Sequence, residues 1–180
     1  FTKLHFPGRD KIFVAYLATM MVPWHAIMIP QFIVVKAFGM YNTHLSLIVL
    51  QAFSAFGVFL LRQNMLSIPD SLHEAAKIDG CSTFGIYRKI ILPLSQNGLA
   101  TLTVLTFNSV WNDYMGPMIY LESDRLKTIQ LGLASFQQQF SADYGAIMAG
   151  TVCSVIPIII VYCIGQKYIV EGVAFAGVKG

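Results

Sequence analysis

The sequence predicts an all-α membrane protein, on the evidence of its composition and the spacing of its charges. Of its 180 residues, 56% are hydrophobic and only 12% are charged, against about 25% charged in an average soluble domain. Four stretches contain no Asp, Glu, Lys or Arg: residues 12–35, 37–61, 90–112 and 145–165. Each stretch exceeds the roughly 18 residues typical of a transmembrane helix. A soluble chain of this length has too little polar surface to cover four such segments.

We therefore predict a single transmembrane domain over residues 1–180, built from four spans and their connecting segments. The chain begins at Phe1 without an initiator Met, so we expect it to be a fragment whose first helices precede that residue. The predicted spans are about 12–35, 44–61, 96–120 and 145–165, with loops at 67–93 and 121–143 and a tail at 166–180.

Local sequence features support these spans. Pro23 and Pro30 predict a kink in the first span, since membrane helices tolerate proline where neighbours satisfy the freed carbonyls. Small residues recur every four positions in the fourth span, which predicts close packing against another helix. The two stripes are Gly145, Ala149, Cys153 and Ala146, Gly150, Ser154.

The distribution of Lys and Arg predicts the orientation of the chain. One set of flanks carries nine of these residues and the opposite set carries three. The larger set comprises Lys3, Arg9, Lys11, Arg62, Lys77, Arg88, Lys89, Lys167 and Lys179. Positive residues accumulate on the cytoplasmic side, so loop 67–93 and tail 166–180 are predicted to be cytoplasmic and loop 121–143 external. The net charge of +3 follows from this topology and does not indicate nucleic-acid binding.

Several polar residues lie inside the predicted spans, where burial in hydrocarbon is costly. Gln51, Asn108, Trp111 and Asn112 are candidates for lining a passage for a polar solute. The alternatives are hydrogen bonds between helices for the amides and interfacial anchoring for the tryptophan.

Loop 67–93 is predicted to form two short helices outside the membrane. Ser71 and Glu74 have the spacing of a capping box, Ala75 and Ala76 favour helix, and Gly80 predicts a left-handed end. A second short helix is predicted at 83–89, and Pro93 is predicted to open the next span.

The first of these helices is predicted to be a docking element. Glu74, Lys77 and Asp79 surround the small Ala75-Ala76 surface, which suits insertion into a groove of a soluble partner. The alternative is that Glu74 only caps the helix. Residues 80–85 have the glycine spacing of a P-loop, but Ile86 and Tyr87 stand where Lys and Ser or Thr are required. The chain is therefore not expected to bind or hydrolyse ATP itself.

The loop resembles the EAA signature of permease subunits of bacterial ABC importers. The pattern Glu-Ala-Ala, three residues, Gly, nine residues, Ile-x-Leu-Pro is matched by Glu74-Ala75-Ala76, Gly80, Ile90, Leu92 and Pro93. Flanking segments are similar to the carbohydrate-uptake branch, and above all to maltose-type permeases ending in Val-Lys-Gly. These segments are residues 19–23, 29–30, 42–43, 59–63, 68–69, 111–113, 132–133 and 172–180.

This resemblance implies a type I transmembrane domain of an ABC importer in the bacterial cytoplasmic membrane. Glu74, Ala75, Ala76, Lys77, Asp79, Gly80, Leu92 and Pro93 would couple to a cytoplasmic ATPase dimer. ATP and Mg²⁺ would be held by that ATPase, with no cofactor on this chain. The tail residues Val178, Lys179 and Gly180 would also contact the ATPase.

The resemblance further implies a second permease subunit, an extracytoplasmic solute-binding protein that faces loop 121–143, a sugar substrate and surrounding lipid. Three alternatives stay open: a permease for a solute other than sugar, a secondary transporter without an ATPase, and a membrane scaffold. A secondary transporter would need a charged or ion-coordinating residue deep in a span, and Asp113 lies near the end of one.

Overall fold

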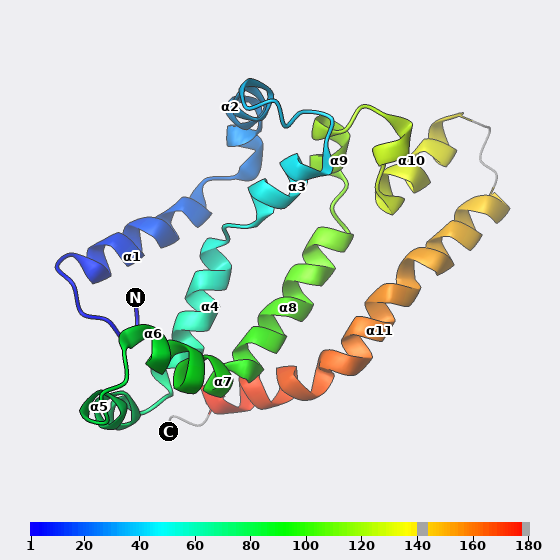
Figure 1. The fold of residues 1–180 in the computed structure, drawn as a ribbon. Coiled ribbons are helices and arrows are strands. Elements are labelled where there is room, and N and C mark those ends of the chain that lie inside the picture. The colour runs from blue at the N-terminus through cyan, green and yellow to red at the C-terminus, as the bar shows by residue number, and fades with distance from the viewer. Residues whose placement is uncertain (140–143, 178–180) are drawn as a thin grey trace. The chain divides into compact units, whose positions relative to one another are not determined.

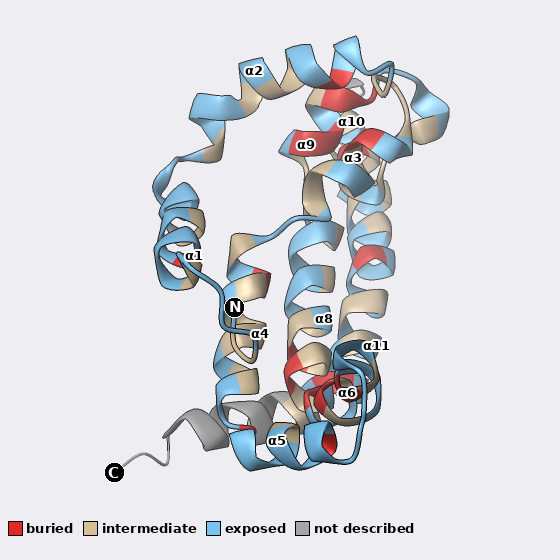
Figure 2. Ribbon diagram, turned by 60° about the vertical axis from the view of Figure 1, so that its left-hand side comes forward, coloured by how far each residue is buried: buried red, intermediate tan, exposed pale blue. Residues whose placement is uncertain are grey.

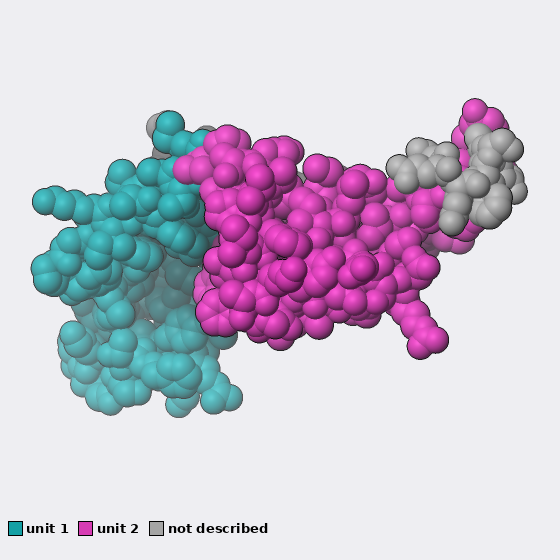
Figure 3. Space-filling model, turned by 90° about the horizontal axis from the view of Figure 1, so that it is seen from above, with its two compact units in different colours: residues 1–21, 54–104, 165–180 teal, residues 22–53, 105–164 magenta. Residues whose placement is uncertain are grey.

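The computed structural model is helical throughout the part of the chain that it describes (Figure 1). It describes the backbone of residues 1–139 and 144–177 and the side chains of residues 1–136 and 144–168. The chain divides into two compact units (Figure 3). Unit 1 comprises Phe1–Met21, Ser54–Val104 and Gly165–Gly180, and unit 2 comprises Val22–Phe53 and Leu105–Ile164.

The apolar run at residues 12–35 forms two helices. Helix α1 (Arg9–Ala18) continues as a short 3₁₀ turn, η1 (Thr19–Met21), and α2 (Trp24–Ala37) begins immediately after Pro23. Proline disfavours the helical conformation of the residue before it, so the preceding helix ends before Pro23. Pro23 itself has an extended backbone, and α2 begins at the next residue. Pro30 lies inside α2 without interrupting it, so the break predicted from the two prolines occurs at Pro23.

The run at residues 44–61 is also divided, into α3 (His44–Gln51) and α4 (Ala55–Leu66). The reason is local. Ser54 is extended, and its hydroxyl oxygen accepts a hydrogen bond from the N–H of Gly57 at 3.1 Å. A serine cap of this kind satisfies a backbone donor that would otherwise be unpaired at the start of a helix.

A third interruption follows α8 (Gln96–Trp111) and precedes α9 (Met115–Tyr120). Asp113 lies in the gap, and its carboxylate accepts from the N–H of Gly116 at 3.1 Å. The carboxylate thus satisfies a donor at the start of α9. The predicted span at 96–120 consequently contains two helices.

Helix α11 (Tyr144–Gly177) runs without a break through the fourth apolar run and through the described part of the predicted tail. One of its small-residue stripes packs in unit 2. A Cβ at Gly150 would lie 2.5 Å from the Leu133 side chain of α10 (Ile129–Gln139). Ser154 is buried, and its carbonyl accepts from the indole of Trp111 at 2.9 Å. The packing predicted for the Ala146, Gly150, Ser154 stripe is confirmed at these two positions.

Helix length and composition identify α11 as a helix that could cross a membrane, over Tyr144–Tyr168. Three helix pairs meet the same criteria jointly, each across a break of at most four residues: α1–η1 with α2, α3 with α4, and residues 83–94 with α8. Among the described residues the number of possible spans is therefore one, or up to four if each broken pair counts as one span.

Unit 2 has a polar rim at the end where α3 begins and α9 ends. Asn42 adopts a left-handed backbone, with φ of 57°. Its side-chain oxygen accepts from the N–H groups of Glu122 and Ser123 at 3.0 and 2.9 Å. His44 donates from its ring to the carbonyl of Leu126 at 2.9 Å. These bonds tie the turn before α3 to the segment after α9.

Helix contact in unit 1 depends on a glycine, and this gives a testable prediction. A Cβ at Gly98 in α8 would lie 2.5 Å from Cγ and 2.8 Å from Cβ of Asn64 in α4. We expect Gly98→Val to destabilise the domain by about 1–3 kcal/mol, because overpacking forces the helices apart. Thermal unfolding of the full-length protein in detergent measures this as a lower midpoint temperature.

Gly132→Ala in α10 is the matched control, because no described atom lies within 4 Å of the added methyl group. Alanine favours helix over glycine, so this variant should keep or raise the midpoint. Equal midpoints for Gly98→Val and the wild type would contradict the close contact between α4 and α8.

Candidate functional site

Helix α5 (Asp70–Ile78) carries the Glu-Ala-Ala sequence. It begins directly after Pro69, whose φ of −60° and ψ of 136° place Asp70 in the first helical position. The capping box predicted from Ser71 and Glu74 is wrong, because no side chain caps this helix. Ser71 lies inside the first turn, where its hydroxyl is past the capping position.

The end of α5 is a Schellman motif built around Gly80. The N–H of Cys81 donates to the carbonyl of Ala76 at 3.0 Å, and the N–H of Gly80 donates to that of Lys77 at 3.2 Å. Both bonds require a left-handed residue, and Gly80 has φ of 77°. The left-handed stop predicted at Gly80 is confirmed.

The rest of the loop is one helical segment with a change of pitch. Helix α6 (Thr83–Ile86) leads through a π-helical turn, η2 (Tyr87–Ile91), into α7 (Leu92–Leu94). Ser82 caps this segment by accepting from the N–H of Gly85 at 3.1 Å. Helicity thus extends beyond the predicted 83–89. Pro93 lies inside the segment, and the 70° bend toward α8 follows it, at Ser95.

Four buried side chains hold the loop together: Ile68, Ala76, Ile86 and Ile91. They come from the residue before Pro69, from α5, from α6 and from η2, and Met65 and Ile90 pack against them. Ala76 is 6% exposed, so the second alanine of the Glu-Ala-Ala sequence faces this cluster. A larger side chain there would force α5 away from α6.

Most of the other residues of α5 are exposed (Figure 2). Glu74, Ala75, Lys77, Asp79 and Gly80 are all exposed, as is Pro93, while Leu92 is half-buried. Of the two alanines predicted to form a flat contact surface, only Ala75 contributes to it.

Large apolar side chains also lie exposed on this loop. Ile78 is 85% exposed and Phe84 is 69% exposed, and the Phe84 and Tyr87 rings lie 6.2 Å apart. Exposed apolar groups clustered beside charged residues are typical of a protein interaction site. This loop of unit 1, from Ile68 to Pro93, is hereafter the docking loop.

The first residues of the chain pack on the docking loop. Lys3 donates to the carbonyl of Ile68 and forms an ion pair with Asp70 at 2.7 Å. Arg62 in α4 donates to the carbonyl of Phe1 at 3.2 Å, and its guanidinium lies 4.2 Å from the centre of the Phe13 ring. The N-terminal segment thereby contacts both α4, through Arg62, and the start of α5, through Ile68 and Asp70.

The hydrogen bond from Lys3, followed by its charge, lowers the pKa of Asp70 below the ordinary 3.8. A carboxyl group whose pKa is lowered by folding stabilises the folded protein at pH values above the pKa that the group has in the unfolded chain. That contribution disappears as the pH falls through the lower folded pKa. It is small in any case, because the Asp70 side chain is 76% exposed.

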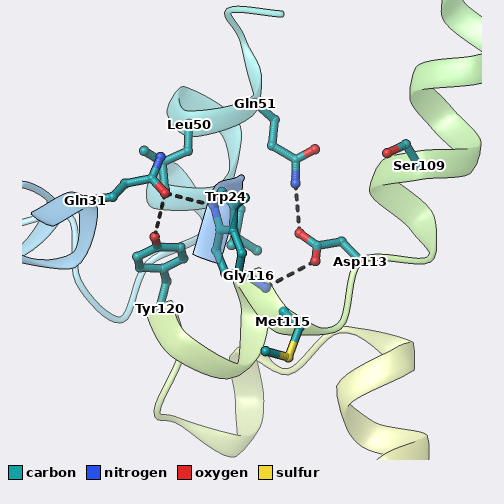
Figure 4. A pocket seen from close by; sticks show the side chains of 10 residues that line it. Trp24, Gln31, Leu50, Gln51, Ser109, Asp113, Met115, Gly116 and Tyr120 are labelled. Atoms are coloured by element: carbon teal, nitrogen blue, oxygen red, sulfur yellow. Dashed lines mark hydrogen bonds between the residues drawn. The ribbon is translucent and has the colours of Figure 1, made fainter. Parts of the chain in front are cut away.

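Unit 2 contains a pocket, and one of the four predicted passage residues lines it. Gln51 is on its wall, and its amide nitrogen donates to the Asp113 carboxylate at 3.0 Å (Figure 4). Asn108 and Asn112 are bonded to each other outside the pocket lining, and Trp111 stacks on Phe107. Asn108, Trp111 and Asn112 do not line this pocket, and their part in a solute passage stays a prediction.

Sequence reasoning missed most of this pocket. Gln31 accepts from the Trp24 indole at 3.0 Å and from the Tyr120 hydroxyl at 2.9 Å. Trp24 and Gln31 are two turns apart on α2, but Tyr120 is 89 residues away from Gln31, and no spacing rule connects it to them. Gln31 in an apolar helix was the one available signal. The predicted ATPase contacts Val178, Lys179 and Gly180 lie outside the described residues.

The left-handed glycine at the end of α5 generates a prediction. We expect Gly80→Val to cost about 1–2 kcal/mol, because a side chain with Cβ is strained at this φ. Local opening of the docking loop should rise in proportion. Tryptic cleavage after the exposed Lys77, measured in inside-out membrane vesicles, should accelerate several-fold.

Gly80→Asn is the matched control. No described atom lies within 4 Å of a Cβ at this position, and asparagine already occupies a left-handed conformation at position 42. It should be cleaved nearly as slowly as the wild type. Equal acceleration of cleavage in both variants would mean that the left-handed backbone angle does not determine which residues are tolerated at position 80.

Comparison with known proteins places these features in a family. Residues 3–174 match the family described as binding-protein-dependent transport system inner membrane component. The arabinooligosaccharides transport system permease protein AraQ of Halalkalibacterium halodurans is 34% identical over 175 residues, which is 97% of this chain and 63% of AraQ. The lactose transport system permease protein LacG of Rhizobium radiobacter is 35% identical over 91% of this chain and 60% of LacG.

A solved structure is also similar. A crystal structure of a bacterial ABC transporter involved in the import of the acidic polysaccharide alginate aligns with a TM-score of 0.80 and 30% identity. The alignment covers 91% of this chain and 63% of that one. This chain thus spans somewhat under two thirds of the length of these relatives. The chain belongs to the family of binding-protein-dependent transport system inner membrane components, with the transmembrane fold of an ABC importer permease.

Proposed function

We propose that this chain is part of a permease subunit of an ABC importer that carries a saccharide across the bacterial cytoplasmic membrane. The observation that carries the proposal is the docking loop. It has a fixed shape, it exposes Glu74 and Gly80, and it holds the Glu-Ala-Ala sequence on a helix outside the apolar runs.

The geometry of the loop suits the transmission of force from a soluble partner. Ala76 fixes α5 to the cluster formed by Ile86 and Ile91. The segment that carries Ile86 and Ile91 continues through α7 into α8, so a displacement of α5 would be passed on to a helix of a predicted span. An ATPase dimer that grips α5 would switch the permease between outward and inward states. ATP provides the differential affinity for the two states that such a switch requires.

The chemistry of the relatives supports a saccharide as the transported solute. Their names assign them to arabinooligosaccharides, lactose and starch degradation products, at 34 to 35% identity to this chain. In this assignment the partners are an ATPase dimer, a second permease subunit and an extracytoplasmic solute-binding protein. ATP and Mg²⁺ belong to the ATPase.

The predicted topology is consistent with these partners. The docking loop and the tail are on the cytoplasmic side, and residues 121–143 are on the external side, where the solute-binding protein would deliver its cargo. The polar rim around Asn42 fixes the first residues of this external segment, since it bonds Glu122 and Ser123.

Glu74→Lys tests the proposal. The carboxylate is exposed and reverses sign, so we expect the ATPase to be lost from the purified complex and sugar uptake to fall at least about tenfold, equivalent to 1.4 kcal/mol of docking energy. Co-purification from membranes and uptake of labelled sugar measure the two effects. Glu122→Lys is the matched control, because Glu122 is an exposed acid on the predicted external side and should leave the ATPase bound.

The outcomes separate the competing functions. Uptake without any co-purifying ATPase would indicate secondary transport, and an ATPase-bound complex that carries only non-saccharide solutes would restrict the proposal to another importer class. Retention of the ATPase at wild-type levels in Glu74→Lys would contradict a docking role for α5.

A further inference from the structure

The pocket in unit 2 has the composition of a binding site for a neutral polyhydroxylated solute. Its volume is about 320 Å³, within the range of roughly 300–1,000 Å³ typical of small-molecule sites. We propose that it is a saccharide-binding site on this chain, with Asp113, Gln31 and Gln51 as hydrogen-bonding groups and Trp24 as the apolar wall. The inference rests on the proposed function and adds to it the residues that hold the solute.

The orientation of both glutamine amides is fixed by their partners. An indole N–H can only donate, so the oxygen of Gln31 faces Trp24 at 3.0 Å. An ionised carboxylate can only accept, so the nitrogen of Gln51 faces Asp113 at 3.0 Å. Only the oxygen of the Gln31 amide and only the nitrogen of the Gln51 amide are therefore used in these hydrogen bonds.

The other ends of the two amides are unpaired within the described part of the chain. The Gln31 nitrogen and the Gln51 oxygen have no hydrogen-bond partner among the described residues, and neither does the hydroxyl of Ser109. A free donor, a free acceptor and a hydroxyl in one pocket match a sugar ring, whose neighbouring hydroxyl groups donate and accept in the same way.

Asp113 provides the strongest acceptor. One carboxylate oxygen accepts from Gln51 and the other from the N–H of Gly116, at 3.0 and 3.1 Å. Each oxygen has a second lone pair, so the carboxylate can also accept from solute hydroxyl groups. Hydrogen bonds to a charged group are stronger than those between neutral groups.

The walls of the pocket are positioned by the same network. Tyr120 is only 1% exposed, so its role is to hold Gln31 through its hydroxyl. Trp24 is half-buried, and Leu50 and Met115 are further apolar residues of the lining (Figure 4). Leu47 also lines the pocket. A metal ion fits less well, because the described residues contain no group of three or more His, Cys, Asp or Glu side chains placed to hold one.

The position of the pocket in the chain agrees with a receiving site. Its residues come from the predicted outer halves of the spans, and the polar rim of Asn42 and His44 flanks it in sequence. A solute released on the external side would meet this pocket before the cytoplasmic half of the domain.

Substrate protection of an introduced cysteine tests the site. Ser109→Cys places a thiol on the exposed wall of the pocket, in the complete transporter with Cys81, Cys153 and Cys163 changed to serine. Labelling by a methanethiosulfonate reagent is measured in proteoliposomes, with lactose, arabinotriose and maltotriose in turn as the probe and leucine as the control. At ten times its half-saturating concentration, the sugar that the wild type transports should slow labelling by about tenfold.

Two controls make the result specific. Thr106→Cys lies on the same helix about one turn away, is exposed and is outside the pocket lining, so its labelling should not change with sugar. Combining Ser109→Cys with Asp113→Ala should abolish the protection. Gly132→Ala in the Ser109→Cys background should retain it.

The possible failures are distinguishable. If the wild type transports none of the three sugars, the proposed sugar import is overturned and the site with it. If a sugar is transported but Ser109→Cys is not protected, or is protected equally with Asp113→Ala, the pocket is not the binding site and the import function stands. Equal protection at Thr106→Cys would indicate a general closure of the helix and would also overturn the site.

Discussion

The contact between Ala76 and the isoleucines at positions 68, 86 and 91 is the interaction on which the account of the docking loop depends. These side chains are 2–7% exposed and come from four successive parts of the loop. Burial of an isoleucine side chain contributes about 1.5–3 kcal/mol. A cluster of this size stabilises one conformation over about 25 residues, whereas segments that only connect helices are usually short. The cluster includes the second alanine of the Glu-Ala-Ala sequence. Part of this signature therefore stabilises the fold of the loop.

The helices that enter the apolar runs obey a second constraint, which is the need to satisfy backbone groups wherever a helix is interrupted. Side chains meet that need here. Ser54 accepts from Gly57, Asp113 accepts from Gly116, and the hydroxyl of Ser95 donates to the carbonyl of Ile91 at 2.7 Å. Unpaired backbone groups cost several kcal/mol in hydrocarbon. Three of the breaks occur at residues that provide these bonds, whereas α2 begins after Pro23 without a side-chain cap. One of the three residues, Asp113, also lines the pocket in unit 2.

Sequence reasoning predicted the helical class, the position of the docking loop and its end at Gly80, because these depend on composition and on short-range chemistry. It predicted the wrong start for α5, since Pro69 occupies the N-cap position two residues before Ser71. It predicted a kink in the first span, but it treated the spans at 44–61 and 96–120 as continuous helices. Hydropathy averages over about twenty residues and does not detect a single serine or aspartate that caps the start of a new helix.

The pocket could not be predicted, because it is made by contacts between residues as distant as Gln31 and Tyr120. Polar residues in apolar runs were recognised as candidates, and Gln51 was among them. To decide whether such a residue lines a pocket or bonds to a neighbour, the hydrogen-bond partners of its side chain must be known, and the sequence does not give them. Asn112 donates to Asn108, four positions before it, and accepts from Gln130, whereas Gln51 and Asp113 meet across the unit.

Hydrogen–deuterium exchange of the docking loop in the membrane-embedded domain tests the central claim most directly. The N–H groups of Asp79, Gly80 and Cys81 are bonded to the last turn of α5. The account predicts that they exchange at least about tenfold more slowly than an unfolded chain before any ATPase is present, which corresponds to 1.4 kcal/mol of local stability. Addition of the ATPase should slow residues 74–80 further. Exchange at the unfolded rate until the ATPase binds, or no change when it binds, would contradict a preformed docking element.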